Sequence, residues 1–161
     1  MDLGSFLPPF FGVLAAFGLN YLYSYFKDLR VRRDLLRGIK TELEHNKELL
    51  KGKGNLLQRQ NWDSAIYSGN AMLVRHEVRS RLGQTYFRIS NHSYEAQMVR
   101  KLGEEARQAW SKDPATGHVT YSQAKYDLWV KRSKRLCENE NALRTEIDGL
   151  LHDHGIWSED C

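Results

Sequence analysis

The sequence predicts an all-α protein in which an N-terminal transmembrane helix continues into a stalk and an antiparallel helical bundle or hairpin. Residues 5–26 contain no charged side chain. Leucines recur at every seventh position from Leu22 to Leu50, a spacing that places them on one side of a helix that packs against another. Long helices are permitted over most of the chain, because it contains only three prolines: Pro8, Pro9 and Pro114.

The uncharged stretch near the N-terminus has the length of a membrane span. A helix needs about 20 largely apolar residues to cross a hydrocarbon core about 30 Å thick, and this stretch has 22. Tyr21, Tyr23 and Tyr25 lie at its end, where amphipathic rings suit the headgroup region. We therefore predict a transmembrane segment over residues 1–27 and a helical domain over residues 28–161. The alternatives are a buried or interfacial helix and a cleaved signal peptide, which would carry its positive charge before the apolar run.

The charges on either side of this stretch predict its orientation. Six Lys and Arg residues lie between positions 27 and 40, and none precedes them. Because Lys and Arg stay on the cytoplasmic side of a span, we expect a single-pass protein of the inner or plasma membrane with its N-terminus outside and residues 28–161 in the cytoplasm. The residues expected to contact anionic lipids of the bilayer are Lys27, Arg30, Arg32 and Arg33.

A row of small residues within the stretch indicates a helix–helix contact. Gly12, Ala16 and Asn20 are spaced four apart, and small residues at this spacing let two membrane helices approach closely. This seam would make the protein a homo-oligomer. Alternatively, the residues reflect only how common small side chains are in membrane helices.

The rest of the chain divides into four helical parts. The first helix continues to Leu50, but Arg32 and Asn46 interrupt its apolar seam, which favours packing within a bundle over a long coiled coil. Glu42, Glu44 and Glu48 are expected on its solvated faces. Residues 51–55 predict a loop, Trp62 to Val74 a second helix, and Leu82 to Trp110 a third. After a break at 112–117, a last helix is expected from Thr120 or Tyr121 to a C-terminal cap at Gly155.

Candidate chemistry is sparse. His152 and His154 with Asp153 and the terminal Cys161 come nearest to a metal site, but residues two apart on a helix point in different directions. The chain contains no phosphate-binding glycine loop and no nucleophile elbow. We therefore predict neither an enzyme nor a bound cofactor or metal. Cys137 and Cys161 form no disulfide framework, which favours a reducing compartment.

Two further groups of basic residues are candidates for an anionic-ligand site. One group is Arg75, Arg79 and Arg81. The other follows Tyr126 and Trp129 and consists of Lys131, Arg132, Lys134 and Arg135. In an oligomer the two groups could converge on an anion, whereas the alternative is an exposed helix face paired with Glu138 and Glu140. Because the basic residues form local patches, a nucleic-acid partner is not predicted.

The order of these features resembles a loose group of uncharacterised single-pass membrane proteins of bacteria and archaea. The likeness rests on an N-terminal span, the basic run 29–37, the stretch 39–46, a short helix centred on Trp62 and two long helices. It implies fold and topology only. Together these features predict a membrane-anchored helical interaction or scaffold module with an unknown protein partner. The alternative is an oligomeric membrane effector or sensor whose bundle binds an anionic, nucleotide-like ligand.

Overall fold

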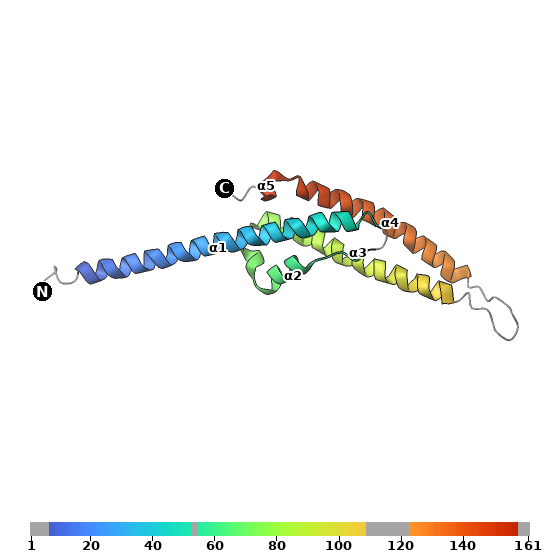
Figure 1. The fold of residues 1–161 in the computed structure, drawn as a ribbon, viewed down its shortest axis with the longest axis horizontal. Coiled ribbons are helices and arrows are strands. Elements are labelled where there is room, and N and C mark those ends of the chain that lie inside the picture. The colour runs from blue at the N-terminus through green and yellow to red at the C-terminus, as the bar shows by residue number, and fades with distance from the viewer. Residues whose placement is uncertain (1–6, 53–54, 109–122, 158–161) are drawn as a thin grey trace.

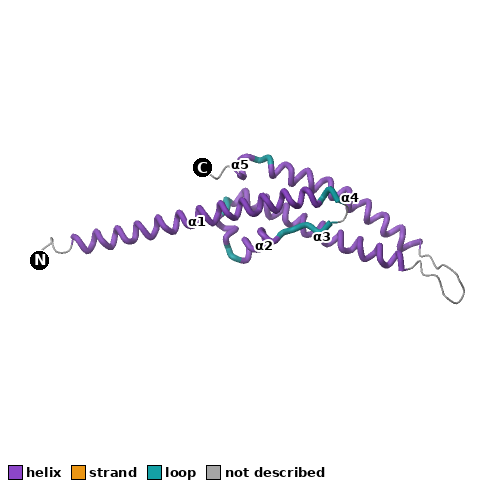
Figure 2. Tube along the Cα trace, in the orientation of Figure 1, coloured by secondary structure: helices purple, strands orange, loops and turns teal. Residues whose placement is uncertain are grey.

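The computed structural model describes residues 7–52, 55–108 and 123–157, and these residues contain helices and loops but no strand (Figures 1 and 2). The predicted all-α class is confirmed for this part of the chain. In order, the elements are α1 (Leu7–Leu49), α2 (Gln60–Tyr67), the 3-10 helix η2 (Asn70–Leu73), α3 (His76–Gln108), α4 (Gln123–Leu151) and α5 (His154–Trp157).

The helices form an elongated bundle around an antiparallel hairpin of α3 and α4 (Figure 1). The C-terminal half of α1 packs along one half of this hairpin, and α2 and η2 lie against α1. The N-terminal half of α1 extends past the bundle at one end, and the hairpin extends past α1 at the other. We call residues 96–108 of α3 and 123–137 of α4 the distal half of the hairpin. The predicted helical bundle or hairpin is therefore confirmed.

A single uninterrupted helix runs from Leu7 to Leu49, as predicted from the absence of proline after Pro9. The leucine seam is buried only in its second half. Leu36 and Leu43 are 5% and 0% exposed, whereas Leu22 and Leu29 are 49% and 37% exposed. The bundle therefore begins near Leu36, and the helix before it has no covering in the described chain.

The predicted transmembrane segment is helical from Leu7 onward. Among the residues that the structure describes, however, no helix combines the length and apolarity needed to cross a membrane. Asn20 and the three tyrosines make this part of α1 less apolar than an aliphatic span. The helical part of the prediction is confirmed, and the crossing of a membrane stays a prediction.

The expected helix from Trp62 to Val74 is divided in two. Gly69 has a φ of +76°, a left-handed conformation that glycine adopts without steric cost, and it separates α2 from η2. Trp62 is buried in α2, and its ring stacks on Tyr86 of α3 with the centroids 5.2 Å apart. Gly69 therefore allows the short segment to fold back while Trp62 stays in the core.

The prediction that Glu42 lies on a solvated face is wrong, because this residue is only 3% exposed. Its Oε1 accepts a hydrogen bond of 2.6 Å from the Tyr86 hydroxyl, and its Oε2 accepts one of 2.7 Å from the backbone N–H of Asn61. The second bond satisfies a backbone donor in the first turn of α2, where a negative charge is also favourable. Burial raises the pKa of Tyr86 above its usual value, and the bond to Glu42 raises it further.

Asn46, which interrupts the leucine seam in the sequence, is fully buried. Its Nδ2 donates to the carbonyl of Gln58 at 2.6 Å, and its Oδ1 accepts from the N–H of Gln58 at 2.7 Å. The side chain thus pairs with both backbone groups of one residue and holds the segment before α2 against α1.

The prediction that the last helix ends at a cap formed by Gly155 is wrong. Helix α4 ends at Leu151, and Gly155 lies inside the short helix α5. The N–H of Gly155 donates to Oδ1 of Asp153 at 2.9 Å, so Asp153 caps α5 at the place where the sequence suggested one helix end. The third helix confirms its predicted periodicity through buried Leu82 and Tyr86. Trp110, the break at 112–117 and the expected start at Thr120 or Tyr121 lie outside the described residues.

The pairing of Asn46 with Gln58 generates a stability prediction. Asn46→Ala removes both hydrogen bonds and leaves two backbone groups of Gln58 without their partner, so we expect a loss of about 1–3 kcal/mol in the free energy of unfolding. A urea titration followed by circular dichroism measures this loss. The control is Thr41→Ala in the same helix, where the exposed hydroxyl bonds only the carbonyl of Arg37 and a change within about 0.5 kcal/mol is expected. Equal losses in the two variants would contradict a specific role for Asn46.

Candidate functional site

The projecting half of α1 is an apolar surface that the described chain leaves uncovered. Every residue from Phe11 to Arg30 is exposed. From Phe11 to Phe26 the large apolar side chains are 49% to 72% exposed: Phe11, Val13, Leu14, Phe17, Leu19, Tyr21, Leu22, Tyr23, Tyr25 and Phe26. They point in all directions around the helix, because they occupy most positions along several consecutive turns. Apolar surface on every side of a helix is typical of one that is buried by lipid or by other chains.

The predicted seam residues lie on this projecting part. Gly12, Ala16 and Asn20 are all exposed. A Cβ added at Gly12 would meet no atom within 4 Å, and the same holds at Gly18 on a different face. Neither glycine is therefore needed for packing within one chain, and the seam is available to a second helix.

The predicted lipid-contacting residues come directly after the apolar segment of α1. Lys27, Arg30 and Arg33 are exposed, whereas Arg32 is half-buried where α1 enters the bundle. Three of the four are therefore exposed next to the apolar segment, and their contact with lipid stays a prediction.

The first candidate anion-binding group lies around the start of α3. Arg75 precedes the helix and is exposed. A guanidinium nitrogen of Arg79 lies 2.9 Å from the sulfur of Met72, and Arg81 forms a 2.5 Å ion pair with Asp153. The hydrogen bond from Arg81 lowers the pKa of the Asp153 carboxyl below its usual value. Arg81 therefore connects α3 to the turn before α5.

The second group, Lys131, Arg132, Lys134 and Arg135, is exposed on the distal half of α4. Arg132 lines a cavity together with Val99 of α3, and Val99 lies about 27 Å along that helix from Arg81 at 1.5 Å per residue. One chain therefore does not bring the two basic groups together. Glu140, expected on the same exposed face as this group, is buried, and its Oε1 lies 3.3 Å from Nε2 of His92.

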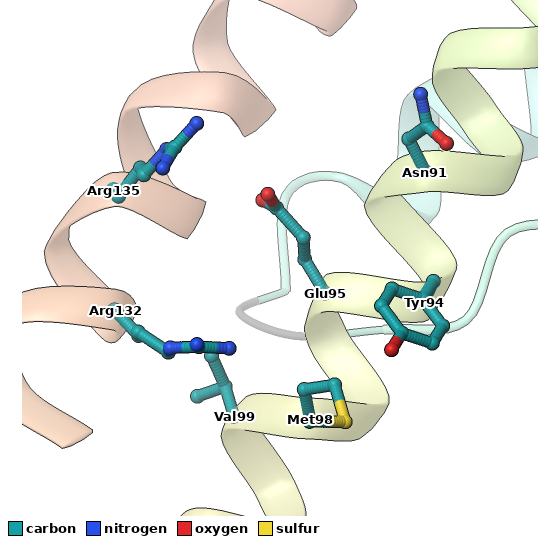
Figure 3. Close-up of a pocket in the computed structure, with 7 residues that line it drawn as sticks. All are labelled: Asn91, Tyr94, Glu95, Met98, Val99, Arg132 and Arg135. Carbon is teal, nitrogen blue, oxygen red and sulfur yellow. The ribbon is translucent and has the colours of Figure 1, made fainter. Parts of the chain in front are cut away.

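Arg132 and Arg135 line a cavity of about 330 Å³ together with side chains of α3 (Figure 3). Within the described residues neither guanidinium forms an ion pair. However, Glu95 points from α3 into the space between the two helices, and its Oε2 accepts a 3.0 Å hydrogen bond from Asn139. A carboxylate inside the cavity lowers the positive potential that an anion would need. This cavity is therefore a poor site for a phosphate group within a single chain.

A second hollow lies around Trp129 in the distal half of the hairpin. Adjoining cavities of about 460, 340 and 230 Å³ all share this side chain. We call their apolar floor the distal groove and define it by Val99, Gly103, Ala106, Tyr126, Trp129 and Cys137. A Cβ added at Gly103 would lie 3.0 Å from Nε1 of Trp129, so the glycine lets the indole approach α3 closely.

The sequence signal for this groove was incomplete. In the sequence, Tyr126 and Trp129 precede the basic group, whereas Val99 and Ala106 lie within the third predicted helix and show no separate pattern. The small residue Gly103, one turn after Val99, was the signal that could have located a close contact with an aromatic side chain.

The described residues contain no group of three or more His, Cys, Asp or Glu side chains placed to hold a metal ion. Nδ1 of His152 lies 3.6 Å from a carboxylate oxygen of Asp148, and His154 is exposed. Cys161 lies outside the described part of the chain. Comparisons with known proteins found no matching family model, no matching curated protein and no matching solved structure.

The seam on α1 generates a prediction about assembly. Gly12→Ile combined with Ala16→Ile should push two packed helices apart and lower the mass of the detergent-solubilised particle. Gly18→Ile is the control, because it meets equally open space within one chain but lies on another face. Asn20→Leu should weaken association by only about 0.6 kcal/mol. If the double variant and the control both keep the wild-type mass, the seam makes no contact.

Proposed function

We propose that this protein is a membrane-anchored helical interaction module. Residues 1–27 act as a single-pass anchor, and residues 28–161 form a cytoplasmic domain that binds a partner protein. The observation that carries the proposal is the exposure of apolar side chains all around α1 between Phe11 and Phe26.

Leaving these apolar side chains in water is unfavourable. Burying one large apolar side chain contributes roughly 1.5–3 kcal/mol, and the projecting helix leaves ten of them in contact with solvent. The uncharged part of α1 from Leu7 to Phe26 is about 30 Å long at 1.5 Å per residue, which matches the hydrocarbon core of a bilayer. Lipid would therefore cover the apolar side chains along the full length of the segment.

The charges next to the segment support the proposed orientation. Lys27, Arg30 and Arg33 begin where the apolar side chains end, and each basic residue near an anionic membrane surface contributes about 1 kcal/mol. Positive charge on one side only favours a cytoplasmic position for that side. The bundle would then extend from the inner surface of the membrane.

The interaction part of the proposal rests on the distal half of the hairpin. The distal groove is apolar, and it lies at the opposite end of the molecule from the N-terminus of α1 (Figure 1). An anchor at one end and a hollow apolar surface at the other suit a protein that holds a partner away from the bilayer.

A flotation experiment tests the anchor. The full chain, reconstituted with vesicles of phosphatidylcholine and phosphatidylglycerol, should float with the lipid and stay there after carbonate washing. Residues 28–161 should be released from the vesicles by the carbonate wash, because only basic residues would hold them there. The fragment should keep a helical circular dichroism spectrum, because the buried core starts at Leu36. The matched variant Leu14→Asp with Phe17→Asp should reduce flotation, since an Asp at a helix centre costs about 3 kcal/mol. Equal flotation of the full chain and the fragment would contradict the anchor.

Cysteine labelling tests the orientation. In chains whose native cysteines are replaced by serine, Leu3→Cys should react with an impermeant maleimide on intact cells, whereas Ala115→Cys should react only after permeabilisation. This outcome follows from the one-sided distribution of Lys and Arg. Reaction of residue 115 in intact cells would reverse the proposed topology. Protection of both positions would indicate a helix that lies on the inner surface without crossing.

A further inference from the structure

The distal groove continues the surface on which α1 packs. On α4, Cys137 lies about three helical turns from Asp148, which pairs with Lys47 of α1. On α3, Glu104 lies about five turns from Tyr86, whose hydroxyl bonds Glu42 of α1. Residues separated by whole turns lie on the same face of a helix. The face of the hairpin that contacts α1 therefore continues into the distal half.

Helix α1 packs against this face outside the distal half of the hairpin. Ile39 and Leu43 of α1 are fully buried there, and α1 ends at Leu49. Beyond that point, the described chain places no third helix on the hairpin (Figure 1). The cavities around Trp129 lie farther along the same face of the hairpin than the end of α1, where a third helix could pack.

The lining of the groove is suited to an amphipathic helix. Its apolar floor is centred on the half-buried Trp129, and Tyr126 beside it is 39% exposed. Ser133 also lines the cavity, with its hydroxyl buried beneath the surface. The groove therefore offers a docked helix an apolar surface centred on an aromatic side chain.

The charges around the groove identify the chemistry of its occupant. The exposed charged residues at the rim are Arg100, Glu104 and Arg107 on α3 and Lys134 on α4. Glu140 also lines the groove, but it is buried beside His92 and does not reach the rim. The distal half of the hairpin as a whole carries eight Lys and Arg against three Asp and Glu. A second copy of this surface would place like charges opposite each other, which costs binding energy. An acidic partner has the complementary charge.

We propose that the distal groove binds an amphipathic helix with acidic flanks that belongs to a different protein. The apolar stripe of this helix covers Trp129 and Val99, and its acidic residues face Arg100 and Lys134. This proposal names the partner class of the interaction module and so rests on the function proposed above. The anchor and the groove lie at opposite ends of the molecule, so the membrane that holds the anchor does not compete for the groove.

Fluorescence anisotropy with designed peptides tests the proposal. The probe is a labelled peptide of about 20 residues with Leu at helical spacing and Glu on both flanks. The comparison probes are the same peptide with Lys in place of each Glu and a single-stranded oligonucleotide of similar length. With the full chain in detergent, we expect saturable binding of the acidic peptide that weakens with added salt. The Lys peptide should bind at least about tenfold more weakly.

Charge-reversal variants locate the binding surface. Arg100→Glu with Lys134→Glu should lower the affinity for the acidic peptide about tenfold or more. The control pair, Lys101→Glu with Lys131→Glu, changes the net charge equally, but these exposed residues do not line the groove. The control should stay within about threefold of wild type. All four side chains are exposed, so both variants should fold, as circular dichroism can verify.

Three outcomes would overturn the proposal. The first is that the acidic peptide does not bind, and the second is that both variant pairs lose the same affinity for it. The third is that the oligonucleotide binds more tightly than the peptide and loses affinity only in the variant Arg100→Glu with Lys134→Glu. The last outcome would assign the groove to nucleic acid. Because the assay contains no bilayer, its failure is independent of the flotation result, and loss of flotation with intact peptide binding would refute the anchor alone.

Discussion

The axial offset between α1 and the α3–α4 hairpin governs the rest of this structure. Buried polar contacts determine where along the hairpin α1 stops. Glu42 accepts hydrogen bonds from Tyr86 of α3 and from the first turn of α2, and Asn46 pairs with both backbone groups of Gln58. Apolar side chains alone tolerate sliding by about two turns, because leucine follows leucine at every seventh position. Directional hydrogen bonds do not, since such a shift would leave buried polar atoms without partners.

Both candidate functional surfaces follow from this offset. An α1 of 43 residues extends past the bundle at its N-terminus, and the hairpin extends past α1 at its distal end. The projecting part of α1 is an apolar helix followed by basic residues. The distal half of the hairpin carries an apolar groove with basic residues at its rim. If α1 packed along the whole hairpin, it would cover the groove and leave no projecting helix. The same contacts therefore expose the proposed anchor and the proposed docking site together.

Continuity of α1 also connects the two surfaces mechanically. A single helix with no proline after Pro9 connects the proposed anchor to the core of the bundle. Lys47 of α1 pairs with Asp148 of α4, and Arg81 of α3 pairs with Asp153 in the turn before α5. These ion pairs connect α1 to α4 and α3 to the C-terminal turn. The distal groove would thus keep a fixed distance and direction from the membrane, which is useful for a protein that positions a partner.

The sequence by itself determined the helical class, the uninterrupted first helix and the approximate positions of the later helices. These depend on local properties: few prolines, apolar residues at helical spacing, and glycines near loops. It also identified residues 5–26 as an uncharged stretch, whereas membrane crossing there stays a prediction. Only the tertiary structure decided which polar residues are buried. Glu42 and Glu48 look alike in the sequence, yet Glu42 meets Tyr86 and Asn61 in the core, while Glu48 is exposed beside Lys51. The distal groove likewise depends on where α1 ends relative to α3 and α4, a relation between distant segments that no local pattern records. Gly103 and Trp129 come together only because the hairpin register places them opposite each other.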